Sequence, residues 1–319
     1  MSCSVTVVKN WWVTLTCLLV IGSVVCTAQA EPSSSIVASS GESTTPLVVR
    51  DPEALRANEP RVDSLDGSED LQQQKPLEQV IAETHAALAV NPKDTEARFE
   101  LAFALEKHGD LDEAMKEYVA VIEQAPEHVW ARNNLGVILA SRGQYDAAIG
   151  RFGEALLRDP DNETARFNSG MTFRKTGEWS AAMRQFKRVL AFNPKHVGAR
   201  VALGQTLYDQ GEADEAIAHY RKAIAIDPQF APAHRHLAKA LTEKGDFAGA
   251  VAEFRAAVRL IPRSSVLRYE FAEALEADGG EREAVRQLRR FLDLHRNRPD
   301  QRALRESAEA KLRALGATP

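Results

Sequence analysis

The sequence predicts an all-α protein, a solenoid of antiparallel helix pairs, and three ladders of residues predict it. Each ladder has a period of 34 residues and runs through six units. The prolines stand at 92, 126, 160, 194, 228 and 262, the glycines at 109, 143, 177, 211, 245 and 279, and the alanines at 114, 148, 182, 216, 250 and 284. Three residue types that share one period indicate a single supersecondary unit that recurs and stacks on its neighbours.

Each unit is expected to form two helices, as 129–162 illustrates. Leu135 and Leu139 lie four residues apart, on one helical face. Gly143 stands where the first helix should end in a left-handed residue, and Pro160 lies beyond the second helix, which it cannot continue. The full repeats are therefore expected at 95–128, 129–162, 163–196, 197–230, 231–264 and 265–298.

Small residues are expected where the two helices of a unit approach closely. The alanine ladder supplies one such position, and the facing one is held by Ala102, Gly136, Gly170, Gly204, Ala238 and Ala272. Two rows of larger side chains surround this contact: Tyr118, Phe152, Phe186, Tyr220, Phe254 and Leu288, and Leu105, Leu139, Phe173, Leu207, Leu241 and Leu275. Stripes at helical spacing predict a buried core, and no cofactor is implied by them.

These residues resemble the tetratricopeptide repeat family. The match lies in the 34-residue period and in positions such as Gly204, Tyr208, Gly211, Ala216 and Pro228. The resemblance implies a right-handed superhelical solenoid of six full repeats. A half repeat over 77–92 is expected to precede them, and an amphipathic helix over 300–315 is expected to cap the last apolar face.

A row of cations stands early in the first helix of each repeat, where the family often has a tryptophan. Its members are Arg98, Arg132, Arg166, Arg200, His234 and Arg268. One interpretation is a surface for an anionic partner. The other, which we favour, is that the stems lie over apolar neighbours with the charged ends in water or beside acids.

The first 30 residues predict an export signal. A lysine precedes an uncharged stretch over 10–30, and Ala28 and Ala30 supply the small residues that a signal peptidase requires. The alternatives are a retained single-span anchor and a lipoprotein acylated at Cys26, which the preceding valine disfavours. We expect the repeats outside the cytoplasm, periplasmic or in the cell envelope, or held to the membrane by this segment.

Residues 31–76 predict a disordered linker rich in serine, proline and acidic residues. The segment has nine acidic and four basic residues and few apolar ones, so it has too little apolar surface to bury in a folded core. All three cysteines, at 3, 17 and 26, precede this segment. A chain cleaved after the signal would therefore contain no disulfide, no thiol nucleophile and no zinc site built on sulfur.

The first helix of each repeat lines the concave side in tetratricopeptide repeat proteins, so the resemblance implies a binding face there. The candidate partner-binding residues are Trp130, Asn133, Asn134, Phe167, Asn168, Met171, Arg174, Lys175, Tyr208, Arg235 and Lys239. Asn134 and Asn168 lie one repeat apart, and their amides could hydrogen-bond the backbone of an extended peptide. Trp130, Phe167 and Tyr208 are expected to be exposed aromatics of the kind that dominate interfaces.

We find no pattern for catalysis. The metalloprotease HExxH, the phosphate-binding GK[ST], the GxSxG elbow and the GxGxxG loop are absent from the sequence. His234 and His236 lie two residues apart on a helix, so they should point to different sides and make a poor metal pair. We therefore expect neither catalytic residues nor a metal or cofactor.

The sequence thus favours a scaffold that docks an extended segment of a partner protein, in an envelope complex, in secretion or in pilus assembly. Two alternatives stay open: a homo-oligomeric module, and binding of an anionic polymer or membrane surface by the basic C-terminal helices. Residues 281–313 carry ten basic and six acidic residues. Nucleic acid is not expected, because the net charge is −5, and membrane contact is expected only through residues 10–30.

Overall fold

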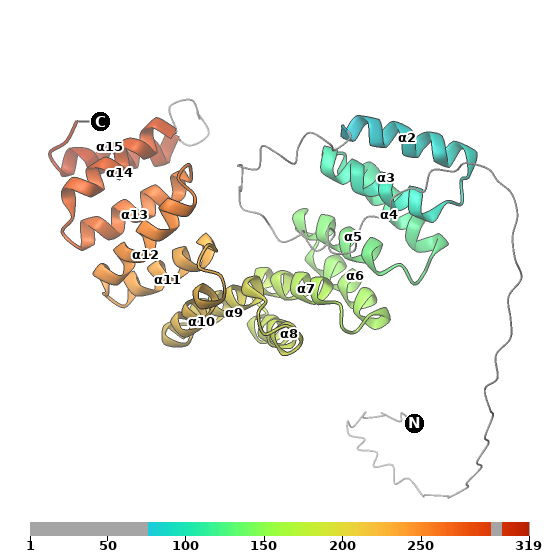
Figure 1. Ribbon diagram of the computed structural model, residues 1–319, viewed down its shortest axis with the longest axis horizontal. Helices are drawn as coiled ribbons and strands as arrows, with labels where there is room; N and C mark the ends of the chain where they lie inside the picture. The colour runs from blue at the N-terminus through green and yellow to red at the C-terminus, as the bar shows by residue number, and fades with distance from the viewer. Residues whose placement is uncertain (1–75, 295–301, 319) are drawn as a thin grey trace, which may run out of the picture. The chain divides into compact units, whose positions relative to one another are not determined.

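The computed structural model describes residues 76–294 and 302–318. Within these ranges the chain forms fourteen helices and no strand, and successive helices run antiparallel (Figure 1). The predicted export signal and the predicted linker up to residue 75 lie outside the described residues. Among the helices that are described, none has the length and apolar character needed to cross a bilayer.

The helices alternate as the first and second members of six pairs. The first helices are α3 (Thr95–His108), α5 (Val129–Ser141), α7 (Glu163–Thr176), α9 (Val197–Asp209), α11 (Ala231–Glu243) and α13 (Ser265–Ala277). The second helices are α4 (Leu111–Gln124), α6 (Tyr145–Arg158), α8 (Trp179–Phe192), α10 (Ala213–Ile226), α12 (Phe247–Leu260) and α14 (Glu281–Leu294). A single helix precedes the pairs and another follows them, α2 (Leu77–Val90) and α15 (Arg302–Ala314). The predicted fold class is confirmed.

The first helices begin at side-chain caps that recur with the repeat. The side chains of Asp94, Asn162 and Ser264 each accept a hydrogen bond from the backbone N–H three residues later. His128 and His196 do the same through Nδ1, at 3.1 and 3.0 Å. The first helix of the fifth repeat lacks a side-chain cap and instead has a proline in its first turn.

The ends of the helices also follow the ladders. Each ladder glycine has a positive φ, +75° at Gly143 and +81° at Gly177, which other residues adopt only with strain. The left-handed residue lets the chain reverse into the second helix after two or three residues. Each ladder proline stands two residues after the end of a second helix, as Pro160 follows Arg158.

Close contact between the two helices of a pair depends on the small residues of the first helix. A Cβ added at Gly136 would lie 2.7 Å from the ring of Phe152, and one added at Gly170 would lie 2.6 Å from the ring of Phe186. The row that contains these rings is buried in all six repeats, as predicted. In the second row Phe173 is only half-buried.

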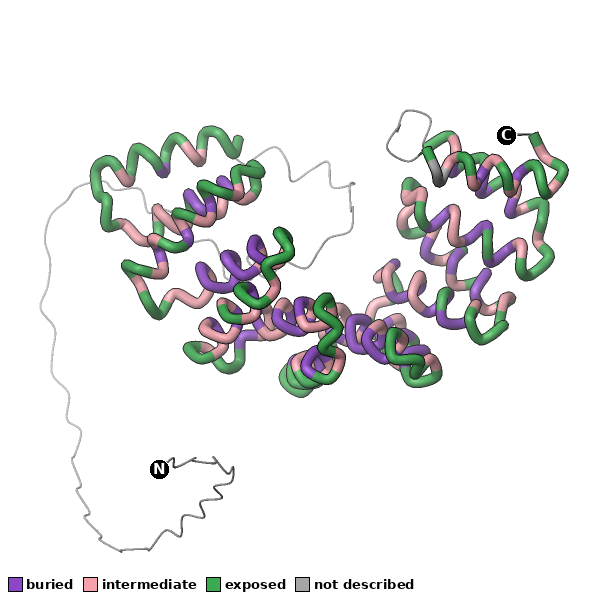
Figure 2. The backbone as a smooth tube through the Cα atoms, turned by 180° about the vertical axis from the view of Figure 1, so that it is seen from behind, coloured by how far each residue is buried: buried purple, intermediate pink, exposed green. Residues whose placement is uncertain are grey.

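The buried residues form a seam along the helix pairs, with exposed residues on the outward-facing turns (Figure 2). The apolar core has two clusters. One comprises residues of repeats 1 and 2 and ends at Phe152, and the other begins at Phe167 and continues to Leu312 of α15. The capping helix thus closes the second cluster with Ala308 and Leu312, both fully buried.

Candidate functional site

The candidate site lies on the first helices, which contact one another along the chain. Helix α7 touches α5 and α9, and α9 touches α11. Side chains from four successive repeats therefore meet on one continuous face, which we call the first-helix face. All eleven candidate residues belong to α5, α7, α9 or α11.

A chain of hydrogen bonds crosses three repeats beneath this face, and we call it the buried amide network. The Tyr118 hydroxyl donates to Oε2 of Glu106 at 2.7 Å and accepts from Nδ2 of Asn134 at 3.0 Å. Nδ2 of Asn133 donates to Oδ1 of Asn134 at 3.1 Å, and Nδ2 of Asn168 donates to Oδ1 of Asn133 at 2.9 Å. The last bond joins α5 to α7, at the place where the two apolar clusters separate.

Burial defines what this network can do. Asn133 is 0% exposed and Asn134 is 4% exposed, whereas Asn168 is half-buried. The first two amides bond within the chain and present almost no surface. Burial raises the pKa of Glu106, against the opposing effects of the Tyr118 hydrogen bond and Lys107, because the carboxylate loses solvation there.

The expectation that Phe167 is an exposed aromatic is wrong. Its side chain is 8% exposed and packs against the Phe186 ring, with centroids 5.8 Å apart. It also stacks on the ring of His196, at 5.3 Å and 27°. Phe167 thus packs against its own second helix and against the residue that caps α9, a contact that the sequence does not reveal.

A polar pocket of about 130 Å³ opens on the first-helix face between α7, α9 and α11. Its lining residues are Arg174, Gln205, Tyr208, Asp209, Tyr220, His236 and Lys239. That volume is room for about four water molecules, so it suits one side chain or a short polar group. The structure brings the predicted Arg174, Tyr208 and Lys239 together in this one place.

His236 forms the floor of the pocket. Its ring stacks on Tyr220, with centroids 5.8 Å apart, and its Nε2 accepts from the amide Nε2 of Gln205. Burial is the main cause that lowers the pKa of His236 to about 3, and the positive charges of Arg235, Lys239 and Arg174 act in the same direction. The imidazole is therefore neutral near pH 7, as its acceptor role requires. The neighbouring His234 points away, toward Glu253 at 2.6 Å.

The charged rim of the pocket is partly neutralised by neighbours one repeat away. Arg174 pairs with Asp209 at 3.0 Å, and Arg235 makes two 2.6 Å bonds to Glu270. Lys239 is exposed, and its Nζ lies 3.8 Å from the same Glu270 carboxylate. Burial and a hydrogen bond to Glu243 raise the pKa of Tyr208 to about 12, so the phenol stays protonated.

The other predicted residues do not line the pocket. Lys175 is exposed, and Trp130 and Met171 are half-buried. Met171 packs against the core, whereas Trp130 stands in the first turn of α5, two repeats before most of the pocket. Within the described residues, no group of three His, Cys, Asp or Glu side chains is placed to hold a metal ion.

Comparison with known families decides the identity of the repeat. A model described as "Tetratricopeptide repeat" matches residues 73–132 and 107–167, and one described as "TPR repeat" matches 204–245. The chain is a tetratricopeptide repeat protein. A third model, described as "Anaphase-promoting complex, cyclosome, subunit 3", matches residues 141–223. No curated protein sequence matches the chain.

Solved tetratricopeptide repeat structures share the fold. PilW, a widely conserved type IV pilus biogenesis factor, is 19% identical over 66% of this chain and 97% of its own, with a TM-score of 0.60. PilF of Pseudomonas aeruginosa is 13% identical over 68% of this chain and 100% of its own, with a TM-score of 0.57. The APC/C hetero-tetramer Cut9-Hcn1 matches over 73% of this chain and 46% of the other, at 14% identity and a TM-score of 0.61. At these identities the likeness concerns the fold alone.

In this tetratricopeptide repeat protein the row of cations, Arg98 and its equivalents, hydrogen-bonds each repeat to the backbone that precedes it. We call its members the ladder residues. In five repeats the ladder residue hydrogen-bonds the carbonyl of the proline six residues earlier, as Arg98 bonds Pro92 at 2.9 Å and His234 bonds Pro228 at 3.0 Å. Arg132, His234 and Arg268 are less than 9% exposed. The favoured interpretation expects the charged ends in water or beside acids. Arg98, Arg132 and His234 do lie beside a glutamate, at 2.6, 3.3 and 2.6 Å. Arg166, Arg200 and Arg268 bond proline carbonyls instead, which the sequence did not indicate.

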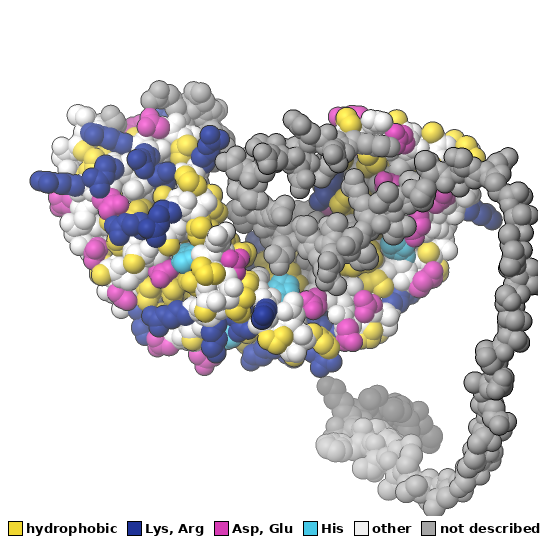
Figure 3. All heavy atoms as spheres, in the orientation of Figure 1, with side chains coloured by type: hydrophobic (Ala, Val, Ile, Leu, Met, Phe, Trp, Pro, Cys, Tyr) yellow, Lys and Arg dark blue, Asp and Glu magenta, His cyan; other side chains and the backbone are white. Residues whose placement is uncertain are grey.

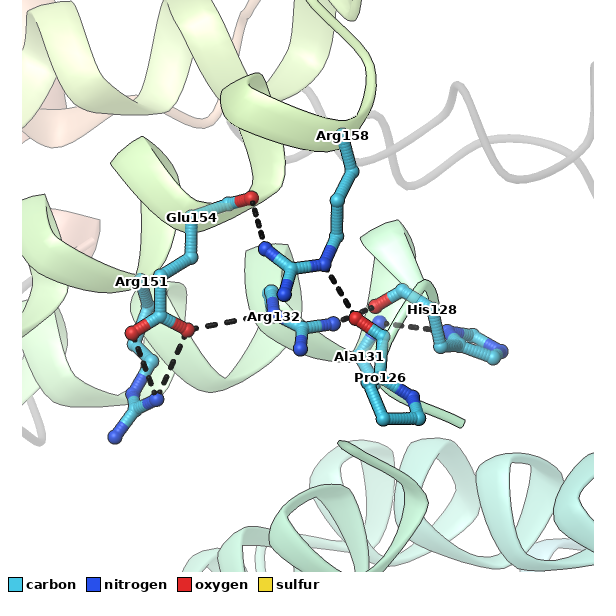
Figure 4. A network of polar contacts seen from close by, with 7 residues as sticks. All are labelled: Pro126, His128, Ala131, Arg132, Arg151, Glu154 and Arg158. Atoms are coloured by element: carbon cyan, nitrogen blue, oxygen red, sulfur yellow. Dashed lines mark hydrogen bonds and ion pairs between the residues drawn. The ribbon is translucent and has the colours of Figure 1, made fainter. Parts of the chain in front are cut away.

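Repeat 2 departs from this pattern, as Figure 4 shows. Nη1 of Arg132 bonds the His128 carbonyl at 3.1 Å, and Arg158 bonds the Pro126 carbonyl in its place. One carboxylate, that of Glu154, lies 3.3 Å from Nε of Arg132 and 3.0 Å from Nη1 of Arg151. Two guanidinium groups thus share one carboxylate, and the third, that of Arg158, bonds the backbone carbonyl of Glu154 at 3.0 Å.

Proposed function

We propose that the protein is a non-catalytic adaptor that docks an extended segment of a partner protein on the first-helix face. Tetratricopeptide repeats mediate contacts between proteins, which supports the proposal. One observation carries the proposal: polar and aromatic side chains from three successive first helices converge on a single pocket, with Lys239 exposed at its rim.

The burial of each side chain indicates whether it contacts the partner or positions other residues. We infer that Tyr208, Lys239 and the pair Arg174–Asp209 contact the partner, since they line the open side of the pocket. Asn133 and Asn134, which are buried, hold Asn168 and α7 in register and act as positioning residues. Lys175 on α7 and Trp130 on α5 would extend the contact toward the N-terminal repeats.

The cellular setting belongs to the same proposal. We infer export to the cell envelope from the predicted signal over residues 1–30, and we propose a role in an envelope complex, in secretion or in pilus assembly. The fold shared with PilW and PilF is compatible with this setting but does not specify a partner. No cofactor is part of the proposal.

The test is partner recovery with pocket variants. Tyr208→Ala combined with Lys239→Ala removes two groups of the open side, and neither residue is fully buried, so the fold should survive. Lys116→Ala on α4 is the matched control, since Lys116 is exposed and far from the pocket in sequence. Loss of the partner with the double variant alone supports the proposal, and equal recovery with all three proteins contradicts it.

A second candidate is binding of an anionic polymer or membrane surface by the C-terminal helices. Arg282, Arg286 and Arg290 are exposed on α14, and Lys and Arg side chains gather on the part of the surface formed by the last helices (Figure 3). Binding of this kind would weaken steeply with salt. Arg282→Glu with Arg286→Glu should then abolish sedimentation with anionic vesicles, whereas unchanged sedimentation would remove this candidate.

A further inference from the structure

The positive charges of the ladder residues are not all balanced by a neighbouring carboxylate. The residue 19 positions after each ladder residue lies on the second helix and faces it. These residues are Glu117, Arg151, Gln185, His219, Glu253 and Gln287. In repeats 1 and 5 the glutamate pairs with the ladder residue at 2.6 Å. In repeats 2 and 4 the same position is held by a cation or by an imidazole, so no carboxylate comes from that place.

Further cations lie near the ladder residues of repeats 2 and 3. Burial, followed by the charges of Arg158 and Arg151, lowers the pKa of Arg132 despite the nearby Glu154. Burial, followed by the charge of Arg188, lowers the pKa of Arg166. In both cases burial is the main cause, and a neighbouring guanidinium charge acts in the same direction.

Repeat 4 continues the pattern. His219 is half-buried, and its Nδ1 has no hydrogen-bond partner in the described part of the chain. Burial lowers its pKa, and the charges of Arg200, Lys222 and Lys187 act in the same direction. Lys187 belongs to α8 of repeat 3, so the positive charge is continuous from one repeat to the next.

We call the accessible members of this set the basic strip: Arg151, Arg158, Lys187, Arg188 and Lys222. They lie on α6, α8 and α10, the second helices of repeats 2, 3 and 4. The ladder arginines of the same repeats lie behind them. The carboxylates of Glu154, Asp161 and Glu215 offset part of the charge.

We propose that the basic strip binds an acidic segment of a partner protein, whose carboxylates take the place that Glu117 and Glu253 take in repeats 1 and 5. The chain itself shows that a carboxylate fits there, because those two glutamates contact Arg98 and His234 at 2.6 Å. The strip lies on the second helices and is therefore separate from the pocket on the first-helix face.

The repeat spacing favours an extended peptide. Helices α6 and α8 each pack on α7, and α8 and α10 each pack on α9, so a first helix lies between successive second helices. Directly packed helices lie about 8–10 Å apart and an extended chain advances about 3.3 Å per residue, so at least about three residues of the segment would pass from one repeat to the next. A run of glutamates or aspartates satisfies this spacing in any register. A bilayer surface would need cations spread over a plane, whereas these follow one line of second helices.

The test uses a fluorescein-labelled peptide of ten glutamates and measures its anisotropy with the full chain at low and high salt. The informative variant combines Arg151→Glu with Arg188→Glu. Arg151→Glu copies Glu117 of repeat 1, and Arg188→Glu copies Glu154 of repeat 2, so both glutamates stand where this chain already places one beside a ladder arginine. The variant should therefore fold, which circular dichroism and a thermal melt check.

The matched control is Lys93→Glu with Lys116→Glu, which makes the same change in net charge at exposed positions away from both the strip and the basic C-terminal helices. We expect the wild type and the control to bind with affinities within about threefold, and the strip variant to bind at least about tenfold more weakly. Wild-type binding should also fall as salt is raised. A second variant, Lys187→Gln with Lys222→Gln, should weaken binding severalfold without touching the ladder.

Four results would overturn the proposal. The wild type would fail to bind the peptide at low salt, or the strip variant would bind as well as the wild type, or the control would lose binding equally. Binding to phosphatidylglycerol vesicles through the strip, without binding to the peptide, would assign the strip to lipid headgroups and also overturn it.

Discussion

The contact between Gly170 and the Phe186 ring is the sharpest test of how the helix pairs pack. A Cβ at position 170 would lie 2.6 Å from Cε1 of Phe186, far inside the 3.4 Å at which ordinary contact begins. Phe186 is 0% exposed, so its ring has nowhere to rotate. Gly170→Ala must therefore push α7 and α8 apart.

The expected loss of stability in Gly170→Ala is best measured against Gly150→Ala on α6. A Cβ at position 150 meets nothing within 4 Å, so that variant gains only the helix propensity of alanine, about 0.5–1 kcal/mol. Gly170→Ala gains the same propensity but adds an overpacking cost of about 1–3 kcal/mol. We expect the free energy of unfolding of Gly170→Ala to lie about 1–3 kcal/mol below that of Gly150→Ala.

Urea denaturation followed by helical circular dichroism measures this difference. With a slope of about 2–3 kcal/mol/M, the midpoints should differ by about 0.3–1.5 M. Repeat 1 carries Ala102 against Tyr118 at the same place, so a helix pair can be built around a methyl group, and the lower part of the range is expected if repeat 3 relaxes toward that spacing. Equal midpoints for the two variants would refute the packing argument.

Three other predictions concern the buried polar groups. Tyr118→Phe removes the hydroxyl between Glu106 and Asn134 and should cost about 1–3 kcal/mol, more than Tyr220→Phe at the equivalent position, as urea midpoints would show. The pKa of Glu106 is raised in the folded state, so ionisation of its carboxyl destabilises the fold as the pH rises. Glu106→Gln should therefore be more stable than the wild type at pH 7, and this difference in stability should vanish below about pH 4.5. The pKa of His236 is lowered to about 3 in the folded state, so below about pH 6.5 only the unfolded chain binds the proton. The free energy of unfolding should therefore fall by on the order of 2 kcal/mol by pH 5. His236→Gln should reduce this dependence of stability on pH, as thermal melts at a series of pH values would show.

The fold was predictable from the sequence because the repeat multiplies every signal six times. A single Gly143 or Pro160 would be weak evidence for a helix end, whereas six of each at one period leave little choice of architecture. The histidine caps were not predicted. Their signal was present, since His128 and His196 stand at the same repeat position as Asp94, but histidine is an unusual capping residue.

The candidate site was predictable only in part, because burial depends on neighbours that the repeat period does not specify. Arg174, Tyr208 and Lys239 meet in one pocket, although nothing in the sequence places their side chains together. The amides of Asn134 and Asn168 were expected to bond a peptide backbone, yet they bond Tyr118 and Asn133 within the chain. Two adjacent asparagines inside an otherwise apolar stretch of α5 were the available signal of a buried network.

Site-specific photo-cross-linking in cells tests the proposed function most directly. A benzophenone amino acid would replace Lys175 or Lys239, both exposed on the first helices, and Lys116 on α4 would carry it as the control. The account predicts that one partner protein cross-links from 175 and 239 and not from 116, and that Tyr208→Ala weakens the product from 239. A partner that cross-links equally well from position 116, or no product from either first-helix position, would contradict docking on the first-helix face.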